Sequence, residues 1–453
     1  MHTRFFLSLC LAWPLSASAS PEALIDLMAV PGSAALGAMQ RIQSSPYKGA
    51  NVGYDLVPLY VYEGERVFLH GTRLGLKLVS EPGYSVDVLL DYRFEGYPYD
   101  QTPAVLDGLP KRTPSVDLGI AYRHRANWGN LDAEILHDAG STSYGTEARF
   151  GYSYDWQSGR WHLRPSVTVA HRSSNLNNYY YGVEAAHAHA LRPAYMPGAG
   201  TNWSLGVYAY YDLTLRWRLL GGVGVNLLDK KVRNSPIVED RVQPTALIGA
   251  AYDFGSHKDH ADASQALHVK LMAGVATDCN LLNAMSLRCM STSTPERTRI
   301  QGLEVGQTLI ERVNGWPLDF VGYVGVLHHD ERGFQSNGLQ LDASIKVYYH
   351  GFPWRSRVRT RIGMGAGVSL AQRVPLVEAQ DQARRGRETS KLLNYLDPSI
   401  DISLGDVIGV KRWSETYVGV GVSHRSGIFG ASQILGNING GSNYFYTYLE
   451  MTL

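Results

Sequence analysis

A histidine and a serine two residues apart near the C-terminus are the side chains best spaced for nucleophilic chemistry. His424 and Ser426 fall on one face of an extended segment, because side chains alternate across a strand. Asn443 begins the next extended segment, on the same face as Phe445 and Leu449. A serine becomes a nucleophile when a base takes its proton and a third group orients that base. The three residues therefore predict a serine esterase with Ser426 as nucleophile, His424 as base and Asn443 as orienting group.

A second interpretation gives these residues no catalytic role. Val420 and Val422 share the face of His424 and Ser426, as expected for a strand whose outer surface meets lipid. Polar side chains at the end of such a strand can lie among the lipid headgroups, where they cost less than in the hydrocarbon. Asn443 would orient a neutral imidazole but would not stabilise an imidazolium as a carboxylate does.

Other polar clusters predict binding rather than catalysis. Arg384, Arg385 and Arg387 lie in a long connection and are suited to lipopolysaccharide phosphates, because a guanidinium binds phosphate through paired hydrogen bonds. A solvated loop is the alternative. The histidines in 187–189 and 328–331 do not complete a metal ligand set, so we expect no metal. The sequence also has no nucleotide-binding motif, so we expect no cofactor.

The elements that must position these residues are β-strands. Apolar and polar residues alternate along most of the chain with the period of two that is typical of strands. In a membrane barrel the apolar face meets lipid and the polar face lines the lumen. We therefore expect charged lumen residues to pair with one another; they are Asp87, Asp91, Arg93, Asp117, Arg123, Glu147, Arg149, Arg359 and Arg361.

The lengths of the connections favour transmembrane barrels over a soluble sandwich. We expect ten strands in the first half, near 53–63, 66–80, 83–95, 114–124, 129–138, 142–157, 160–172, 201–213, 215–227 and 243–254. We expect eight in the second half, near 266–276, 301–311, 319–328, 338–350, 357–371, 399–405, 416–426 and 443–453. In each half the long connections fall on one side and the short ones on the other, as in outer-membrane barrels.

The two halves meet after the segment Ala246-Leu-Ile-Gly-Ala-Ala-Tyr-Asp-Phe254. Its apolar face ends in Tyr-x-Phe, which is typical of the last strand of an outer-membrane barrel, and a polar linker at 255–264 follows. We therefore predict two barrels in tandem, at 51–254 and 265–453. A lead-in at 20–50, with a short helix at 21–28, precedes them. The alternative is one 18-stranded barrel.

The first residues predict export. A basic start, an apolar run and the small residues Ala17-Ser-Ala19 form a signal peptide at 1–19, and no other stretch approaches the 18 apolar residues of a membrane helix. In an exported protein, Cys279 and Cys289 are expected to form one disulfide. The net charge of +1 gives no sign of a nucleic-acid partner.

Several motifs of the first half resemble one family of outer-membrane proteins. They are Ser45-Pro-Tyr-Lys-Gly49, Pro58-Leu-Tyr-Val-Tyr-Glu-Gly-Glu-Arg66, Leu74-Gly-Leu-Lys-Leu78, Asn178-Tyr-Tyr-Tyr-Gly-Val183 and the closing Ala-Tyr-Asp-Phe254. Over about 45–255 the chain resembles the MipA/OmpV family. The resemblance implies a barrel that acts as an envelope scaffold for a murein hydrolase or synthase, or as a small channel. It implies no catalytic residues.

The last two strands of the second half resemble another family. Ser423-His-Arg-Ser426 and Asn439-Gly440 are similar to the lipid A 3-O-deacylases of the PagL type, eight-stranded barrels with a His-x-Ser pair on the lipid-facing wall. This chain departs from that pattern at two positions. Asn443 stands where the family has a carboxylate, and Gly427 stands where it has an asparagine after the serine.

The sequence as a whole predicts an all-β protein of the Gram-negative outer membrane, in contact with lipopolysaccharide. The scaffold or small channel is the first hypothesis for its function. The second is a lipid A deacylase in the C-terminal barrel. The third is a porin, which would need the wide lumen of a single large barrel.

Overall fold

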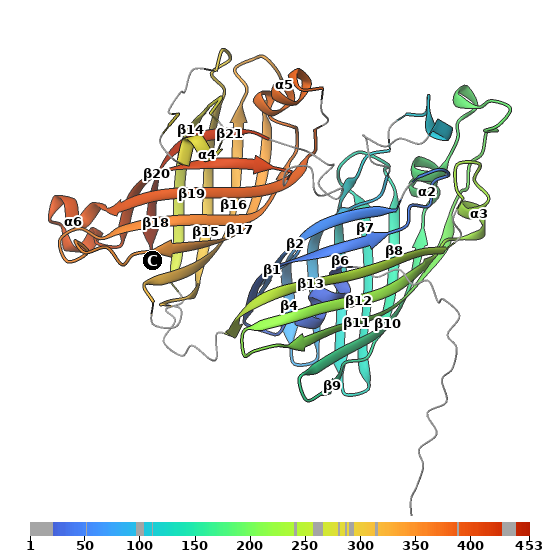
Figure 1. The fold of residues 1–453 in the computed structure, drawn as a ribbon, viewed down its shortest axis with the longest axis horizontal. Coiled ribbons are helices and arrows are strands. Elements are labelled where there is room, and N and C mark those ends of the chain that lie inside the picture. Colours follow the sequence, from blue (N-terminus) through green and yellow to red (C-terminus); the bar gives the residue numbers. More distant parts are fainter. Residues whose placement is uncertain are drawn as a thin grey trace, which may run out of the picture.

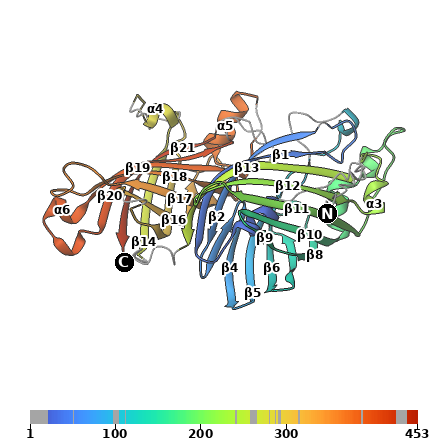
Figure 2. The same cartoon turned by 60° about the horizontal axis from the view of Figure 1, so that its bottom comes forward.

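The structure is a computed structural model in which two closed antiparallel β-barrels lie side by side (Figures 1 and 2). It describes residues 21–50, 52–96, 104–110, 112–239, 242–256, 266–279, 281–285, 288–289, 294–312, 316–386, 389–427 and 441–453. The expected signal peptide at 1–19, Arg387 and residues 257–264 of the expected linker lie outside these ranges. The predicted all-β fold of two barrels in tandem is confirmed, and the alternative of one 18-stranded barrel is wrong.

The first barrel has twelve strands. They are β1 (Ser33–Gln43), β2 (Gly53–Glu63), β3 (Val67–His70), β4 (Arg73–Glu81), β5 (Tyr84–Arg93), β6 (Ser115–Ala126), β7 (Gly129–Asp138), β8 (Thr146–Ser153), β10 (Trp161–Arg172), β11 (Gly200–Asp212), β12 (Trp217–Leu227) and β13 (Val242–Ser256). The short β9 (Trp156–Ser158) extends the hairpin with β10, and pairing of β10 with β11 closes the barrel.

Two strands of this barrel were not expected. β1 lies within the stretch for which we expected a lead-in, and it pairs with β13 on one side and β2 on the other. The expected strand at 66–80 is two strands, because the chain reverses at Gly71, which has a φ of +64° that favours glycine. The first barrel therefore has twelve strands where ten were expected. The number is still even, so the first and the last strand of the barrel have their free ends on the same side of the membrane.

The lumen of the first barrel contains a helix, α1 (Pro21–Met28), whose bounds match the predicted helix. Leu24, Ile25 and Met28 are fully buried and pack among lumen side chains that include Leu59 and Leu220. Hydrogen bonds through His70 of β3 join the helix to the barrel wall. Its Nδ1 lies 2.7 Å from Asp26 of α1, and its Nε2 lies 2.6 Å from Glu63 of β2. An imidazole that holds a carboxylate at each nitrogen must donate from both, which requires the protonated form.

The rest of this lumen is lined by charged side chains that pair as predicted. Arg73 contacts Asp91 at 3.0 Å and Glu134 at 2.7 Å, and Arg93 contacts Glu147 at 2.8 Å. The residues expected to pair in this lumen also form the pairs Arg93 with Asp117, Arg149 with Asp91 and Glu147, and Arg123 with Asp87. A polar cavity of about 370 Å³ remains between these residues and α1.

The long connections of the first barrel form a small core of their own over its outer mouth. Tyr47, from the first family motif, donates a hydrogen bond to the backbone oxygen of Tyr180, from the fourth, at 3.1 Å. Both tyrosines are buried with Leu176, Val232 and other loop residues. α2 (Ser174–Tyr181) and α3 (Lys230–Arg233) belong to this cap, as do the turns at Ala104–Leu106 and Ala185–His187. The two motifs therefore meet at the outer end of the barrel.

The second barrel has eight strands, the predicted number. They are β14 (Leu267–Ala276), β15 (Arg299–Ile310), β16 (Leu318–Asp330), β17 (Gly338–Tyr349), β18 (Thr360–Ala371), β19 (Leu392–Ser403), β20 (Thr416–Ser426) and β21 (Asn443–Thr452). The outer connections carry α4 (Leu281–Met285) and α5 (Leu376–Arg384), and one inner connection carries α6 (Leu404–Ile408) and a turn at Lys411–Trp413. β19 starts seven residues before the predicted 399.

Side chains fill the middle of the second barrel. Lys270, Lys346, Tyr348 and Tyr395 are fully buried there, with Asp397 among them. Arg361 lies in the lumen and contacts Asp401 at 2.8 Å and Glu450 at 2.9 Å, whereas Arg359 lies in the inner connection beside Asp406 and Glu415. Both arginines therefore pair within this barrel. A small barrel has no open pore when its interior is filled in this way.

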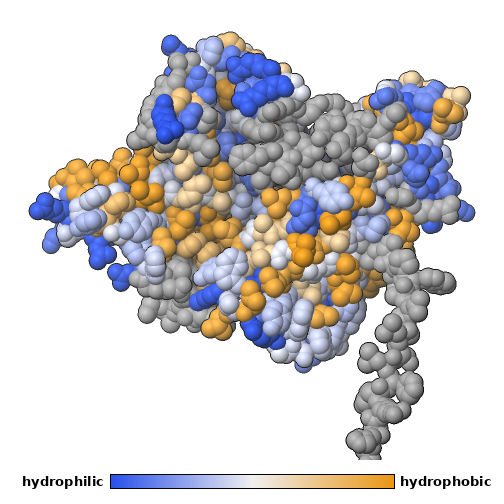
Figure 3. All heavy atoms as spheres, viewed as in Figure 1, coloured by the Kyte–Doolittle hydropathy of each residue, from blue (hydrophilic) through white to orange (hydrophobic). Residues whose placement is uncertain are grey.

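The outward faces of the strands are apolar, as a lipid-facing surface requires. Ile400 and Ile402 of β19 and Val418 and Val420 of β20 are all exposed. Figure 3 shows apolar residues over the strands of both barrels and hydrophilic residues around α5. Among the described residues, no helix is long and apolar enough to cross a membrane.

The two barrels pack against each other along one side. Two hydrogen bonds cross the contact, from Tyr60 Oη to Asn394 Oδ1 at 3.3 Å and from Tyr62 Oη to Gln307 Oε1 at 3.0 Å. Leu69, Leu74 and Tyr92 of the first barrel share an apolar cluster with Ala343, Val368 and Leu392 of the second. The short β3 leaves Tyr60 free to reach β19, so the second barrel covers the place where the hairpin of β3 and β4 ends.

Candidate functional site

The outer ends of β19, β20 and β21 form a row of polar side chains on the outside of the second barrel. His424 lies directly opposite Asn443 in the register of β20 and β21. His424 is 8% exposed and Ser426 is half-buried, while Val418 and Val420 of the same row are open to lipid. Directly opposed residues of an antiparallel pair have Cβ atoms about 4.5–5.5 Å apart. The structure thus places the predicted base and orienting group together.

The histidine is oriented for use as a base. Its Nδ1 lies 2.6 Å from Asn443 Oδ1, and an amide oxygen only accepts, so Nδ1 carries the proton. Nε2 is then unprotonated and can take a proton from a hydroxyl. Cysteine proteases of the papain type use an asparagine in this orienting position, so a carboxylate is not required for the geometry.

The predicted nucleophile lies on the same face as its base. Ser426 is two residues beyond His424 on one strand, so the two Cα atoms are about 6.5–7 Å apart. Among the described residues, no hydrogen bond joins Ser426 Oγ to the His424 ring. Catalytic hydrogen bonds are often long without substrate and tighten in the complex.

A fourth polar residue of the row was not predicted. Asn394 of β19 lies directly opposite Ser426, on the side away from Asn443. It is 4% exposed, and its Oδ1 accepts the hydrogen bond from Tyr60. The sequence predicts a connection at 372–398, between the expected strands at 357–371 and 399–405, and residue 394 falls within it. The short, mostly apolar run Leu392-Leu-Asn-Tyr-Leu396 is the signal that could have placed it in a strand.

Arg425, between the two predicted catalytic residues, anchors the outer end of β20 from the lumen side. Its side chain is 1% exposed and donates to Glu378 Oε2 at 3.0 Å, to Ser369 Oγ at 2.8 Å and to the backbone oxygens of Ser390 and Lys391. Glu378 belongs to α5, so this bond ties α5 over the outer mouth. Burial raises the pKa of the Glu378 carboxyl, and the nearby Arg425 guanidinium opposes that rise.

A disulfide-closed loop covers the wall just inside the row. Cys279 and Cys289 are bonded, with Cα atoms 5.7 Å apart, so the predicted disulfide is present. Cys279 and Ala284 of this loop pack on Val422 of β20, which has Phe445 beside it. The loop therefore forms one wall beside His424.

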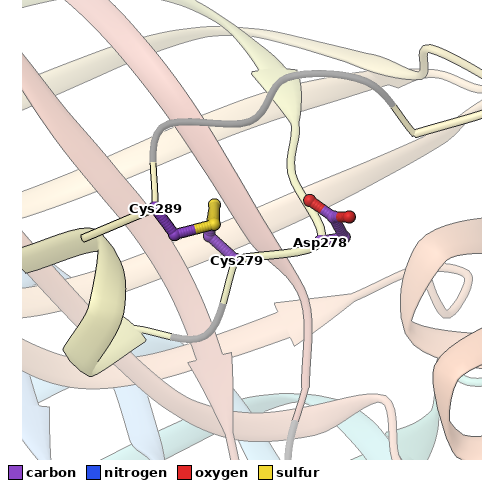
Figure 4. A group of neighbouring side chains, drawn as sticks. All are labelled: Asp278, Cys279 and Cys289. Carbon is purple, nitrogen blue, oxygen red and sulfur yellow. A yellow bond between two sulfur atoms is a disulfide. The ribbon is translucent and has the colours of Figure 1, made fainter. Parts of the chain in front are cut away.

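The same cysteines exclude a metal site here. Asp278, Cys279 and Cys289 are the one group of potential ligands that lie close together in the described part of the chain. Figure 4 shows that the two sulfur atoms are joined. A disulfide offers no thiolate, which is the form of cysteine that binds metals, so a single carboxylate remains.

The other predicted clusters have structural contacts or remain open to solvent. Arg384 and Arg385 are exposed at the end of α5 and contact Asp381 at 3.6 Å and 3.2 Å. His329 lies in the lumen between Gln340 and Tyr444, and Glu331 accepts a hydrogen bond from the first backbone N–H of α5. His187 is half-buried beside Glu184. None of these groups assembles a metal ligand set within the described residues.

Comparison with known proteins assigns the first barrel. The family described as MltA-interacting protein MipA matches residues 36–254. The chain is 29% identical over 210 residues to the outer membrane protein Omp26La of Vibrio anguillarum, covering 46% of this chain and 81% of that protein. It is 25% identical over 229 residues to the MltA-interacting protein of Escherichia coli K12, covering 49% of this chain and 91% of that protein. The outer membrane protein OmpV of Vibrio cholerae is 28% identical over 210 residues, which cover 46% of this chain and 81% of that protein.

The fold and these relatives together define an outer-membrane β-barrel protein. The first barrel is of the MipA/OmpV type, and the family match lies within residues 36–254, just under half of the chain. The match ends at residue 254, two residues before β13 ends. The relation of the second barrel to lipid A deacylases therefore depends on its own residues and geometry.

Proposed function

We propose that the protein is an envelope scaffold that holds a murein hydrolase or synthase at the inner surface of the outer membrane. The observation that carries this proposal is that both lumens are occupied, the first by α1 and the second by side chains. A relative of the first barrel is named for its interaction with another protein rather than for transport. The short inner turns of a scaffold face the periplasm, where such enzymes work.

The inner connection between β19 and β20 is the surface we expect a partner to reach. It is folded, because Ser403 caps α6 and the Arg359 guanidinium holds Asp406 through two hydrogen bonds of 2.9 Å and 3.0 Å. It also presents exposed apolar side chains, among them Val407 and Trp413. A photo-crosslinking residue at Val407 should capture a murein hydrolase or synthase in cells.

The matched control for that experiment is Leu191, which is 86% exposed in an outer connection of the first barrel. The same crosslinker at Leu191 should capture no periplasmic enzyme. Repeated capture of only unrelated proteins from Val407, with the barrel folded, would count against the scaffold.

The channel hypotheses predict solute flux, which the filled lumens oppose. A porin or small channel would let sugars swell liposomes that contain the purified protein. We expect no swelling above that of empty liposomes. Flux comparable to that of a general porin would remove the scaffold proposal as stated and show that α1 leaves the lumen.

Ile25→Asp should loosen α1. Ile25 is 1% exposed, and a carboxylate buried there without a partner costs several kcal/mol. A cysteine at Ser204, which lines the 370 Å³ cavity, should then react with a small thiol reagent at least about tenfold faster, since about 1.4 kcal/mol corresponds to tenfold. Val30→Asp is the control, because Val30 is 48% exposed just after the helix. Equal rates for the two variants would show that α1 does not limit access.

We propose a lipid A deacylase in the second barrel as a second function. The specific support is the hydrogen bond from His424 to Asn443 beside a serine on the lipid-facing row. Ser426 Oγ would attack the ester carbonyl carbon while His424 Nε2 takes its proton. The sugar hydroxyl leaves with that proton, and water then releases the fatty acid from Ser426. The exposed Arg384 and Arg385, with Arg387, would bind the phosphates of the substrate.

A further inference from the structure

We propose that Asn394 stabilises the oxyanion formed at Ser426 and that Tyr60 of the first barrel orients it. This inference depends on the deacylase proposed above. It adds Asn394 to the polar row of Ser426, His424 and Asn443. It also means that Tyr60 of the first barrel positions a residue that acts in the second. Two features support it, the register of β19 and β20 and the hydrogen bond from Tyr60 to Asn394 that crosses between the barrels.

Asn394 and Ser426 point to the same side of the wall at the same height. They are directly opposed in the antiparallel pair, where side chains of opposed residues lie on one face with Cβ atoms about 4.5–5.5 Å apart. Leu396 lies opposite His424 in the same register. Across β19, β20 and β21 the order is therefore Asn394, then Ser426 and His424, then Asn443. Asn394 lies beside the nucleophile Ser426, and Asn443 lies beside the base His424.

The Tyr60 hydroxyl fixes which end of the amide faces the serine. It lies 3.3 Å from Asn394 Oδ1, and both side chains are at least nine-tenths buried. A hydroxyl that donates to the amide oxygen leaves the two N–H groups of Nδ2 for other acceptors. Among the described residues, none accepts a hydrogen bond from Nδ2. A donor that has no acceptor in the described part of the chain thus lies beside the proposed nucleophile.

The reaction needs such a donor. When Ser426 Oγ bonds to the ester carbon, the carbonyl electrons move to its oxygen, and the negative charge must be met by donors about 2.7–3.1 Å away. The residue after Ser426 is Gly427, which has no side-chain donor. Asn394, on the neighbouring strand, supplies the side-chain hydrogen-bond donor that Gly427 cannot provide. The charge returns to the carbonyl when the sugar oxygen leaves with the proton from His424.

The competing explanation is that Asn394 only ties the two barrels together. Tyr62 provides the test, because its hydroxyl makes the other hydrogen bond between the barrels, to Gln307 at 3.0 Å. If the bond of Tyr60 were only an adhesive contact, Tyr60→Phe and Tyr62→Phe would have the same effect. If Tyr60 orients an oxyanion donor, Tyr60→Phe alone lowers the rate.

The experiment measures fatty-acid release from hexa-acylated lipid A in mixed micelles by the purified full-length protein. Asn394→Ala should lower kcat about 100- to 1,000-fold, the loss seen when an oxyanion donor is removed, with KM nearly unchanged because the donor acts in the transition state. Asn394→Asp should lose as much, since it keeps the shape and removes the N–H donors. Tyr60→Phe should lower kcat by less, and Tyr62→Phe should leave it unchanged.

Each outcome decides between the proposals. Wild-type release together with full kcat in Asn394→Ala would overturn the inference and leave the deacylase standing. No release by folded wild-type protein would overturn both. Equal losses of kcat in Tyr60→Phe and Tyr62→Phe would show that the hydrogen bond of Tyr60 only holds the two barrels together. Electrophoresis of unheated samples, in which a folded barrel migrates apart from the unfolded chain, shows that each variant has folded.

Discussion

Ser426→Ala should abolish the removal of an acyl chain from lipid A. Cells that express the wild-type chain should show a lipid A species that has lost one acyl chain, and cells that express the variant should not. The expected loss is at least about 1,000-fold, because removal of a serine nucleophile leaves only the catalysis that binding and the oxyanion site provide. Mass spectrometry of extracted lipid A measures it directly.

Ser423→Ala is the matched control. Ser423 lies on the same strand but is 3% exposed and faces the lumen, because it is an odd number of residues from Ser426. It should leave the acyl loss unchanged. If lipid A is the same with wild type, Ser426→Ala and empty vector, and the protein is folded in the outer membrane, then the row has no esterase role. The scaffold would then be the remaining proposal.

The period of the sequence predicted most of the strands but not where they break. Alternation depends on which face each side chain takes, so it identified the lumen and lipid faces over long segments such as β5 and β6. A reversal through a two-residue turn appears in it only as a change of phase. In the expected strand at 66–80 the outward apolar residues are Val67 and Leu69 before the turn and Leu74 and Leu76 after it, so odd positions give way to even ones. The chain turns at that change, where Gly71 has a positive φ.

Asn394 was missed for a related reason. Pro398 lies inside β19, and proline has no N–H to donate to the ladder, so a run that contains it is demoted as a strand. The structure tolerates it because the pairing with β20 skips residues 397 and 398 and resumes on both sides. The predicted strand begins at 399, directly after Pro398, so the first part of β19 and the residue opposite Ser426 fall in the predicted connection.

The sequence of β2 contains a sign of the helix in the first lumen, because its lumen-facing residues are apolar. β2 is apolar on both faces, with Val57, Leu59 and Val61 toward the lumen and Leu56 and Tyr60 outward. A lumen face is polar when water fills the barrel. An apolar lumen face thus indicates a packed element inside. The sequence predicts the helix at 21–28, and the structure shows that this helix is the element that packs there.

Asp397→Ala should be the most destabilising single substitution in the second barrel. Asp397 Oδ2 lies 2.6 Å from Lys346 Nζ and 3.6 Å from Lys270 Nζ, and both lysines are fully buried. Lys270 keeps Glu304 as a partner, but Lys346 has no other ion pair among the described residues. Removing one partner of a buried ion pair typically costs about 3–5 kcal/mol, because the other charge stays buried. Urea unfolding of the refolded protein, followed by electrophoresis of unheated samples, measures the shift.

Two further variants separate the buried charge from the loss of packing. Ile400→Ala changes a lipid-facing residue of the same strand, which is 46% exposed, and should shift the unfolding midpoint little. Asp397→Ala combined with Lys346→Met should recover most of the lost stability, because a buried ion pair replaced by apolar groups of similar size is often neutral. If the double variant is as unstable as Asp397→Ala alone, the cavity or the lost Tyr446 hydrogen bond accounts for the effect. If Asp397→Ala unfolds like the wild type, the interior admits enough water to solvate Lys346, and the barrel is less tightly filled than its buried residues indicate.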